Sequence, residues 1–274
     1  MSRLKSLASS AIYRGLLAMP ESVVAGVEAK ARLVQGKGGG AATVADEVSA
    51  GLSVLEPGRR SAPVVLDVGA NVGDWADALL RAAPAASLTC FEPSSVAFSR
   101  LQERMVGRTN VSLLPVALGR AAGSAQLWSD QDGSGLASLT RRRLDHFGMD
   151  FSHSEMVVVE TLDEWAQSAG VRPNLIKLDV EGHELDVLLS GRNTVSQSSV
   201  VQFEFGGCNI DTRTYFQDFF YFFKELDFGL FRLSPRGLVP IPEYRESDEA
   251  FDTSNFFAVS RRGNGLPNAL DQTE

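Results

Sequence analysis

Residues 64–73 read VVLDVGANVG, which is a short apolar run, an aspartate and two glycines four positions apart. A buried strand that passes through a tight turn directly into a helix has this pattern. Because glycine has no Cβ, Gly69 and Gly73 allow the backbone to approach a ligand closely. The next apolar run ends in Glu92, where a carboxylate could hold the two hydroxyls of a ribose. The two segments together predict a nucleoside pocket.

The residues of this turn discriminate between two kinds of nucleoside. A dinucleotide-binding turn would need glycine at positions 69, 71 and 74, with a pyrophosphate on the helix N-terminus. This chain has Gly69, Asn71 and Asp74 there, and the carboxylate of Asp74 would repel the phosphates. An adenosyl ligand without phosphate, such as S-adenosylmethionine, fits better. The alternative is a strand-to-helix turn that binds nothing, since short glycine motifs also occur without a ligand.

The composition describes a globular chain of 274 residues with a net charge of −8. This length allows one large domain and an N-terminal extension. The acidic balance argues against nucleic-acid binding, which relies on Lys and Arg to neutralise phosphates. No apolar run is long enough to span a bilayer. Cys90 and Cys208 have no metal or redox spacing around them, so we expect a reducing, cytoplasmic compartment.

Residues 1–20 predict a short amphipathic helix that ends at Pro20 and carries Arg3, Lys5 and Arg14 as its only charges. Such a helix could make peripheral contact with a membrane surface. It could equally pack on the rest of the chain as a lid, or form the arm of a homodimer. Three cations are few for a membrane-binding helix, so packing is the favoured interpretation. A cleaved secretory signal is not expected, because polar residues interrupt the apolar stretch.

The rest of the chain divides into three parts. Glycine-rich residues 36–40 predict a flexible linker, so residues 1–60 are assigned to a helical extension and linker, 61–262 to the main domain and 263–274 to a disordered tail. From Pro63 onward strands and helices alternate, which is typical of a mostly parallel sheet with helices on both faces. Seven strands are expected, near 63–68, 87–92, 111–116, 174–179, 199–205, 228–233 and 255–260. Helices are expected near 73–83, 94–107, 162–169, 183–190 and 212–226.

Four acids fall at the carboxyl ends of expected strands, namely Asp67, Glu92, Asp179 and Glu204. Ligands of parallel α/β sheets bind at this edge, so we expect these side chains to share a cleft. Residues 117–160 form an insertion between the third and fourth strands of this sheet. It contains two hairpin-like pieces, 124–128 and 156–160.

Four motifs, in this order, resemble the FkbM family of S-adenosylmethionine-dependent methyltransferases. They are DVGANVG at 67–73, FEP at 91–93, TLDEW at 161–165 and IKLDVEGHE at 176–184. The combination is more specific than any one motif, and the resemblance covers roughly residues 60–260. It implies a Rossmann-like α/β fold with a seven-stranded, mostly parallel sheet whose last strand is antiparallel. Residues 1–60 lie outside it as an N-terminal helical extension.

The resemblance also implies a reaction, the in-line transfer of a methyl group from S-adenosylmethionine to a hydroxyl. The acceptor would be a sugar, a glycolipid or a polyketide-like natural product. By position, the methionine part of the cofactor would be surrounded by Asp67, Gly69, Asn71 and Gly73. Glu92 would bind the ribose hydroxyls.

An alcohol must lose its proton as it is methylated, and Asp179, Glu181 and His183 are the candidates for the base. Asp179 is the best placed, at a strand end that faces the cofactor. Glu181 could instead cap the following helix, because a helix N-terminus favours an acid. Histidine is a common general base, but His183 could point along the helix surface.

A metal-dependent variant is the less favoured mechanism. Related small-molecule methyltransferases hold a divalent cation between acids of the fourth and fifth strands, which here are Asp179 and Glu204. Oxygen ligands suit Mg²⁺, but residues 205–207 read FGG where those enzymes have an Asp-Asn pair. We therefore expect transfer without a metal.

Two other functions compete with methyl transfer. An NAD(P)-dependent oxidoreductase would need a third glycine in the phosphate-binding turn and no acid there. This chain has no third glycine in the turn, and it has an acid. A non-catalytic, methyltransferase-like adaptor would be expected to have a damaged cofactor pocket, whereas the motifs here are intact. A saccharide is the first expectation for the acceptor, and it comes from the family's usual substrates rather than from these residues.

Overall fold

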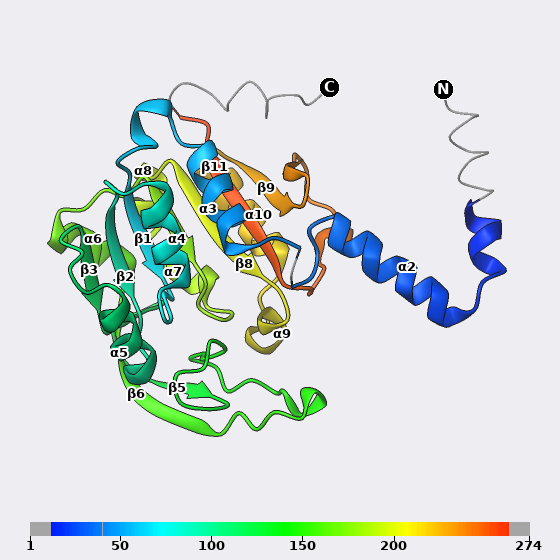
Figure 1. Ribbon diagram of the computed structural model, residues 1–274, viewed down its shortest axis with the longest axis horizontal. Coiled ribbons are helices and arrows are strands. Elements are labelled where there is room, and N and C mark those ends of the chain that lie inside the picture. Colours follow the sequence, from blue (N-terminus) through cyan, green and yellow to red (C-terminus); the bar gives the residue numbers. More distant parts are fainter. Residues whose placement is uncertain (1–11, 40, 263–274) are drawn as a thin grey trace.

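The computed structural model describes residues 12–39 and 41–262, and its centre is an eight-stranded sheet (Figure 1). The strand order is β10-β9-β11-β8-β7-β1-β2-β3. β11 is antiparallel to both of its neighbours, whereas β1, β2, β3, β7 and β8 are parallel to one another. The strands are β1 (Val64–Val68), β2 (Ser87–Phe91), β3 (Val111–Leu114), β7 (Leu175–Leu178), β8 (Val200–Phe205), β9 (Phe228–Ser234), β10 (Gly237–Ile241) and β11 (Ser254–Ser260). The Rossmann-like α/β expectation is confirmed, with β10 as an additional edge strand.

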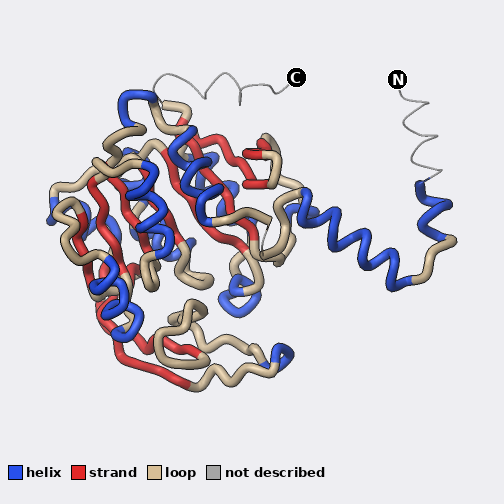
Figure 2. The backbone as a smooth tube through the Cα atoms, viewed as in Figure 1, coloured by secondary structure: helices blue, strands red, loops and turns tan. Residues whose placement is uncertain are grey.

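Helices cover both faces of this sheet (Figure 2). One face carries α3 (Val44–Ser53), α4 (Asp74–Ala82) and α5 (Ser95–Arg104); the other carries α6 (Leu162–Ala169), α7 (Glu184–Ser190), α8 (Arg192–Gln197) and α10 (Phe216–Glu225). The spacing of apolar residues in α4 explains why this helix packs on the sheet. The apolar side chains on one side of the helix are buried, namely Trp75, Ala76, Leu79 and Leu80. A further helix, α9 (Cys208–Thr212), follows β8.

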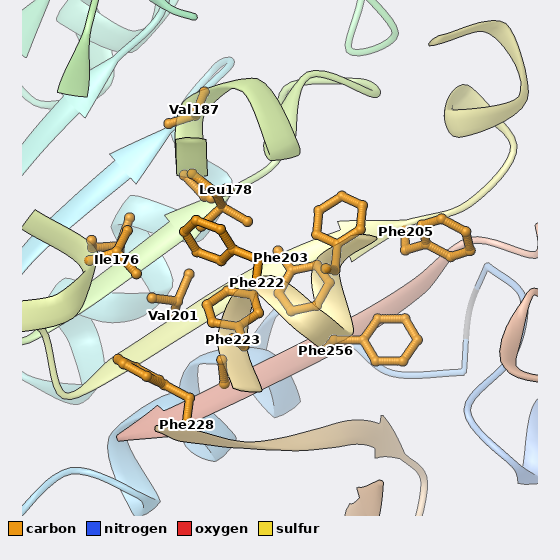
Figure 3. Close-up of a cluster of buried hydrophobic side chains, with 14 of the residues drawn as sticks. Ile176, Leu178, Val187, Val201, Phe203, Phe205, Phe222, Phe223, Phe228 and Phe256 are labelled. Carbon is orange, nitrogen blue, oxygen red and sulfur yellow. The ribbon is translucent and has the colours of Figure 1, made fainter. Parts of the chain in front are cut away.

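The phenylalanines of α10 form the core of the second face. Phe219 stacks on Phe203 of β8 with ring centroids 5.0 Å apart, and Phe216 contacts Phe256 of β11 at 4.6 Å. Figure 3 shows Phe203, Phe223 and Phe256 grouped over the sheet. Aromatic pairs in this offset or tilted geometry add to the energy of burial. These rings therefore serve packing.

The N-terminal segment has two different parts. Residues 12–17 are helical, and α2 (Glu21–Val34) extends away from the body of the protein with no buried residue (Figure 1). Two residues of the expected linker contact the rest of the protein. A Cβ on Gly36 would lie 1.9 Å from the carbonyl oxygen of Leu233, and the Gly38 N–H donates to the Thr253 carbonyl. α3 packs on the sheet through Gly51.

Several expectations concern residues that the structure does not describe. Residues 1–11, the first part of the expected amphipathic helix, and the tail 263–274 lie outside the described residues. A membrane or dimer role for residues 1–20, and the domain boundaries, stay predictions. Among the helices that are described, none is long and apolar enough to cross a membrane.

The insertion forms a small sheet of its own. Its strands are β4 (Ala117–Leu118), β5 (Gly123–Ser129) and β6 (His153–Glu160), in the order β4-β6-β5 with β5 and β6 antiparallel. The two predicted hairpin pieces are therefore paired with each other. The insertion lies along the edge of the molecule at which β8 ends and α9 begins (Figure 1).

Candidate functional site

A cavity lies at the carboxyl ends of β1, β2 and β7, with about 640 Å³ of empty space including its mouth. Three of its walls come from the β1–α4 turn, the end of β2 and the loop after β7. The insertion and the residues just before it close the remaining side. The lining residues from this side are Val116, Ala117, Leu118, Leu127, Ser134, Gly135, Ala137 and Leu139. A cleft is thus present at the strand ends and is covered by the insertion. Of the four acids expected to share it, Glu92 and Asp179 line it, whereas Asp67 and Glu204 are not among its lining residues.

Glu92 lies in the cavity wall with each carboxylate oxygen bonded to the backbone. Oε2 accepts the Asn71 N–H at 2.7 Å, and Oε1 accepts the Ser94 N–H at 2.8 Å. The residue is 6% exposed, and burial raises the pKa of Glu92 to about 7. Because each oxygen has more than one lone pair, the carboxylate can still accept hydrogen bonds from a ligand.

Asn71 provides a second acceptor in the same wall. Its backbone has a φ of 48°, a left-handed conformation that asparagine tolerates better than most residues. Its Oδ1 is buried and has no hydrogen-bond partner among the described residues. A buried polar atom without a partner is costly, so a donor on a bound ligand would compensate for this cost. Glu92 and Asn71 together suit a ligand that carries hydroxyl and ammonium donors.

A buried ion-pair network lies beneath the cavity. The Nζ of Lys177 is 3.1 Å from Asp67 Oδ1 and 3.5 Å from Asp179 Oδ2, and it donates to the Gly69 carbonyl at 2.9 Å. Burial raises the pKa of Asp67, and Lys177 opposes this shift. For Lys177 burial acts to lower the pKa, but the two aspartates outweigh it and raise the pKa. The network therefore ties the ends of β1 and β7 together.

The two glycines of the turn make room for neighbouring parts of the protein. A Cβ on Gly69 would lie 1.8 Å from the carbonyl oxygen of Asp179, and one on Gly73 would lie 2.7 Å from Leu101. Both have positive φ angles, which glycine adopts without strain. Loop and helix packing therefore adds a reason for both glycines, and the close approach of a ligand to Gly69 stays a prediction.

The structure divides the five expected cofactor residues into two groups. Gly69, Asn71 and Glu92 line the cavity. Asp67 is fully buried and, with Gly73, lies outside the lining residues. The first group can touch a ligand, while the second supports the turn from behind.

All three candidate bases, Asp179, Glu181 and His183, line the cavity. Glu181 has a φ of 52° and accepts a hydrogen bond from Arg142 Nη1 at 2.6 Å. Burial is the main cause that raises the pKa of Glu181, and Asp179 adds to it. The structure gives Glu181 no capping role, because no side chain among the described residues caps the N-terminus of α7. Glu184 instead accepts the N–H groups of Val180 and Gly182 in the loop before that helix. Burial raises the pKa of Glu184 to about 7.

His183 is held from both sides of its ring. Its Nδ1 is 2.9 Å from Asp186 Oδ2, and its Nε2 is 3.0 Å from the hydroxyl of Thr140. Thr140 belongs to the insertion, and the nearby Ser138 hydroxyl donates to the Glu181 carbonyl at 2.8 Å. The insertion is thus bonded to the loop after β7 at several points.

A group of three carboxylates lies at one end of the site. Oxygens of Asp179, Glu181 and Glu204 all lie within 4.8 Å of one another. Burial and the neighbouring acids raise the pKa of Glu204 well above its ordinary value. Asp179 and Glu204, the two acids that the sequence suggested as cation ligands, thus lie close together, and Glu181 is in the same group. Carboxylate oxygens are ligands that suit Mg²⁺. Lys177 and Arg142 already place positive charge beside two of the three.

Sequence reasoning missed Arg142, Thr140 and Asp186. Arg142 and Thr140 lie in the insertion, where no periodic pattern marks their positions. Asp186 follows His183 by three residues at the start of α7, so helical spacing could have indicated this pair.

Comparisons with known proteins match the same family as the four sequence motifs at 67–73, 91–93, 161–165 and 176–184. The Methyltransferase FkbM domain model matches residues 67–230. The 2-O-methyltransferase NoeI of Sinorhizobium fredii is 31% identical over 164 residues, which cover 56% of this chain and 66% of NoeI. The hexuronic acid methyltransferase AglP of Haloferax volcanii is 29% identical over 141 residues, which cover 50% of this chain and 54% of AglP.

These relatives are matched over only part of their length, between 54% and 66%. Among solved structures, the FkbM methyltransferase of Methylobacillus flagellatus KT superposes with a TM-score of 0.46 at 16% identity, over 86% of this chain and 60% of that one.

Proposed function

The chain belongs to the FkbM methyltransferase family, and we propose that it is an S-adenosylmethionine-dependent O-methyltransferase that acts on a hydroxyl of a saccharide. Two relatives support the acceptor class. NoeI is named as a 2-O-methyltransferase and AglP as a methyltransferase of a hexuronic acid.

The observation that carries the proposal is the pair of acceptors formed by Glu92 and Asn71. A ribose diol has two donors, and the Glu92 carboxylate can accept both while it keeps the Asn71 and Ser94 N–H groups. The buried Oδ1 of Asn71 offers an acceptor to the methionine part of the cofactor. Gly69 contributes its backbone to the same wall, and Asp67 and Gly73 hold the turn in this shape.

The charges of the cavity support a ligand without phosphate. Among the described residues that line it, Glu92, Asp179 and Glu181 are acidic, and His183 is the one basic side chain. Asp74 stands at the start of α4 and pairs with Arg104. A pyrophosphate would meet repulsion here, whereas a sulfonium and an ammonium would meet attraction.

The remaining residues of the site can serve the acceptor. When bound, S-adenosylmethionine supplies a methyl group that its sulfonium already activates. The chain must therefore orient the acceptor hydroxyl and take up its proton. Asp179, Glu181 and His183 are the groups able to take up this proton, and residues of the insertion form another part of the cavity wall. Charge compensation by Lys177 and Arg142 favours a reaction without a metal.

Two measurements test the proposal. Calorimetric titration should show binding of S-adenosylmethionine and S-adenosylhomocysteine, with no binding of NADH. Radiolabelled S-adenosylmethionine should then transfer its methyl group to members of a panel of glycosides and hexuronic acids. Absence of cofactor binding by the folded protein would refute the enzyme class. Cofactor binding without transfer to any saccharide would refute the acceptor class.

A further inference from the structure

We propose that His183 accepts the proton of the acceptor hydroxyl and that Asp186 is the positioning residue that orients its ring. This inference rests on the proposed methyl transfer and selects one of the three candidate bases. It starts from the two contacts of the ring, with Asp186 Oδ2 at 2.9 Å from Nδ1 and the Thr140 hydroxyl at 3.0 Å from Nε2.

These contacts determine which ring nitrogen carries the proton. An ionised aspartate can only accept a hydrogen bond, so Nδ1 of the neutral ring must be the donor to Asp186. Nε2 then keeps its lone pair and accepts the Thr140 hydroxyl. A hydroxyl group therefore already occupies the place that an acceptor alcohol needs. The same order of groups, carboxylate, imidazole and hydroxyl, activates the nucleophile in hydrolase triads.

An acceptor alcohol in the cavity would replace the Thr140 hydroxyl at this nitrogen. His183 lines the cavity, as does Leu139, which precedes Thr140 in the insertion. The side chain of His183 is 16% exposed, so the protein encloses most of it. Because Asp186 lies three residues further on, the two side chains share a face at the start of α7.

The other two candidates lie beside positive charge. Asp179 has Lys177 at 3.5 Å, and Glu181 has Arg142 at 2.6 Å. A proton that arrives on either carboxylate would weaken an existing ion pair. A proton that arrives on His183 creates one, because the imidazolium faces the carboxylate of Asp186.

The proposed step balances in atoms and charge. The acceptor oxygen forms a bond to the methyl carbon while its proton passes to Nε2 of His183. The carbon–sulfur bond breaks, and its electron pair remains on sulfur, which becomes a neutral thioether. The imidazolium then returns its proton to solvent, and Asp186 remains ionised throughout.

The tautomer of His183 can be measured without knowledge of the acceptor. The chain has three histidines, so a long-range ¹H–¹⁵N NMR spectrum of the cofactor-free protein is simple, and His183→Gln assigns the signal. At alkaline pH we expect the proton of the neutral ring on Nδ1, and on Nε2 in Asp186→Asn, whose amide group can donate to Nδ1. A wild-type ring protonated on Nε2, or one unaffected by Asp186→Asn, would overturn the dyad.

Kinetics then test the role of the dyad, with a saccharide that the wild type methylates. We expect His183→Gln and Asp186→Asn to lower kcat by about 100-fold or more, with KM and the affinity for S-adenosylhomocysteine within about threefold of wild type. Asp186→Glu should recover part of the loss. A kcat within about threefold of wild type in Asp186→Asn would refute the assignment.

The chain offers a matched control for Asp186→Asn. Asp132 lies 3.7 Å from His153, and both side chains are more than half exposed. Asp132→Asn removes the same charge beside a histidine and should leave both kcat and the His183 signal unchanged. If no saccharide is methylated by the wild type, the proposed acceptor is wrong, and the tautomer still decides whether the dyad exists.

Discussion

Lys177 Nζ lies 3.1 Å from Asp67 Oδ1, and both side chains are buried in the sheet, behind the turn between β1 and α4. Removal of one partner leaves an uncompensated buried charge. We therefore expect Lys177→Met to lower the free energy of unfolding by about 3–5 kcal/mol. Denaturant titration measures this loss.

A double variant separates the cost of an unpaired buried charge from the cost of altered side-chain packing at Asp67 and Lys177. Asp67→Asn combined with Lys177→Met removes both charges and should unfold at a higher denaturant concentration than Lys177→Met alone. If the single variant has the stability of the wild type, the pair does not hold the two strand ends together.

The affinity for S-adenosylhomocysteine should depend on the ionisation of Glu92. Burial raises the pKa of this group to about 7, and only the ionised form accepts both ribose hydroxyls. The affinity should therefore be full above this pH and fall by up to about tenfold per pH unit below it. Glu92→Gln should bind about 10–100-fold more weakly and show little pH dependence. Calorimetry over this pH range checks the slope, and a slope that persists in Glu92→Gln would assign it to another group.

Gly69→Ala should be far more damaging than the same change at Gly107. Both glycines have nearly the same backbone angle, with φ of 78° and 80°. A Cβ at Gly107 meets nothing within 4 Å, whereas one at Gly69 meets the Asp179 backbone. Gly107→Ala should cost only the left-handed strain, about 1–2 kcal/mol. Gly69→Ala should unfold at a much lower temperature and lose S-adenosylhomocysteine binding. Equal melting temperatures would contradict the packing role of Gly69.

Methyl transfer should not require a divalent cation. Lys177 and Arg142 already compensate Asp179 and Glu181, which leaves less attraction for a cation among the three carboxylates. We expect the rate to stay within about twofold after EDTA treatment and to change as little when Mg²⁺ or Mn²⁺ is added. A rate that disappears with EDTA and returns with Mg²⁺ would show that Asp179, Glu181 and Glu204 hold a metal.

The sequence predicted the elements whose pattern comes from burial. All seven expected strands are present, because central strands covered on both faces appear as continuous apolar runs. β10 was missed because it is an edge strand, largely exposed, with Pro240 in it. α8 and α9 were missed because six and five residues are too few to show a helical period.

The part of the site formed by the carboxyl ends of the strands could be predicted from the sequence. Glu92 and Asp179 line the cavity at the carboxyl ends of the strands, because parallel strands bring these ends together. Asp67 and Glu204 also lie near strand ends but are not among the residues that line the cavity. The contacts made by Arg142 and Thr140 could not be predicted, because they depend on how the insertion folds back over the cavity. The partners of Gly73 were equally hidden, since they come from the neighbouring helix α5.

The central claim is that the ends of β1 and β2 bind an adenosyl ligand without phosphate. Calorimetric titration with S-adenosylhomocysteine, with NADH as the comparison and Glu92→Ala as the variant, tests it most directly. We predict one site per chain for S-adenosylhomocysteine, no heat with NADH, and loss of binding in Glu92→Ala with its fold intact. Binding of NADH in place of S-adenosylhomocysteine, or undiminished affinity in Glu92→Ala, would contradict the claim.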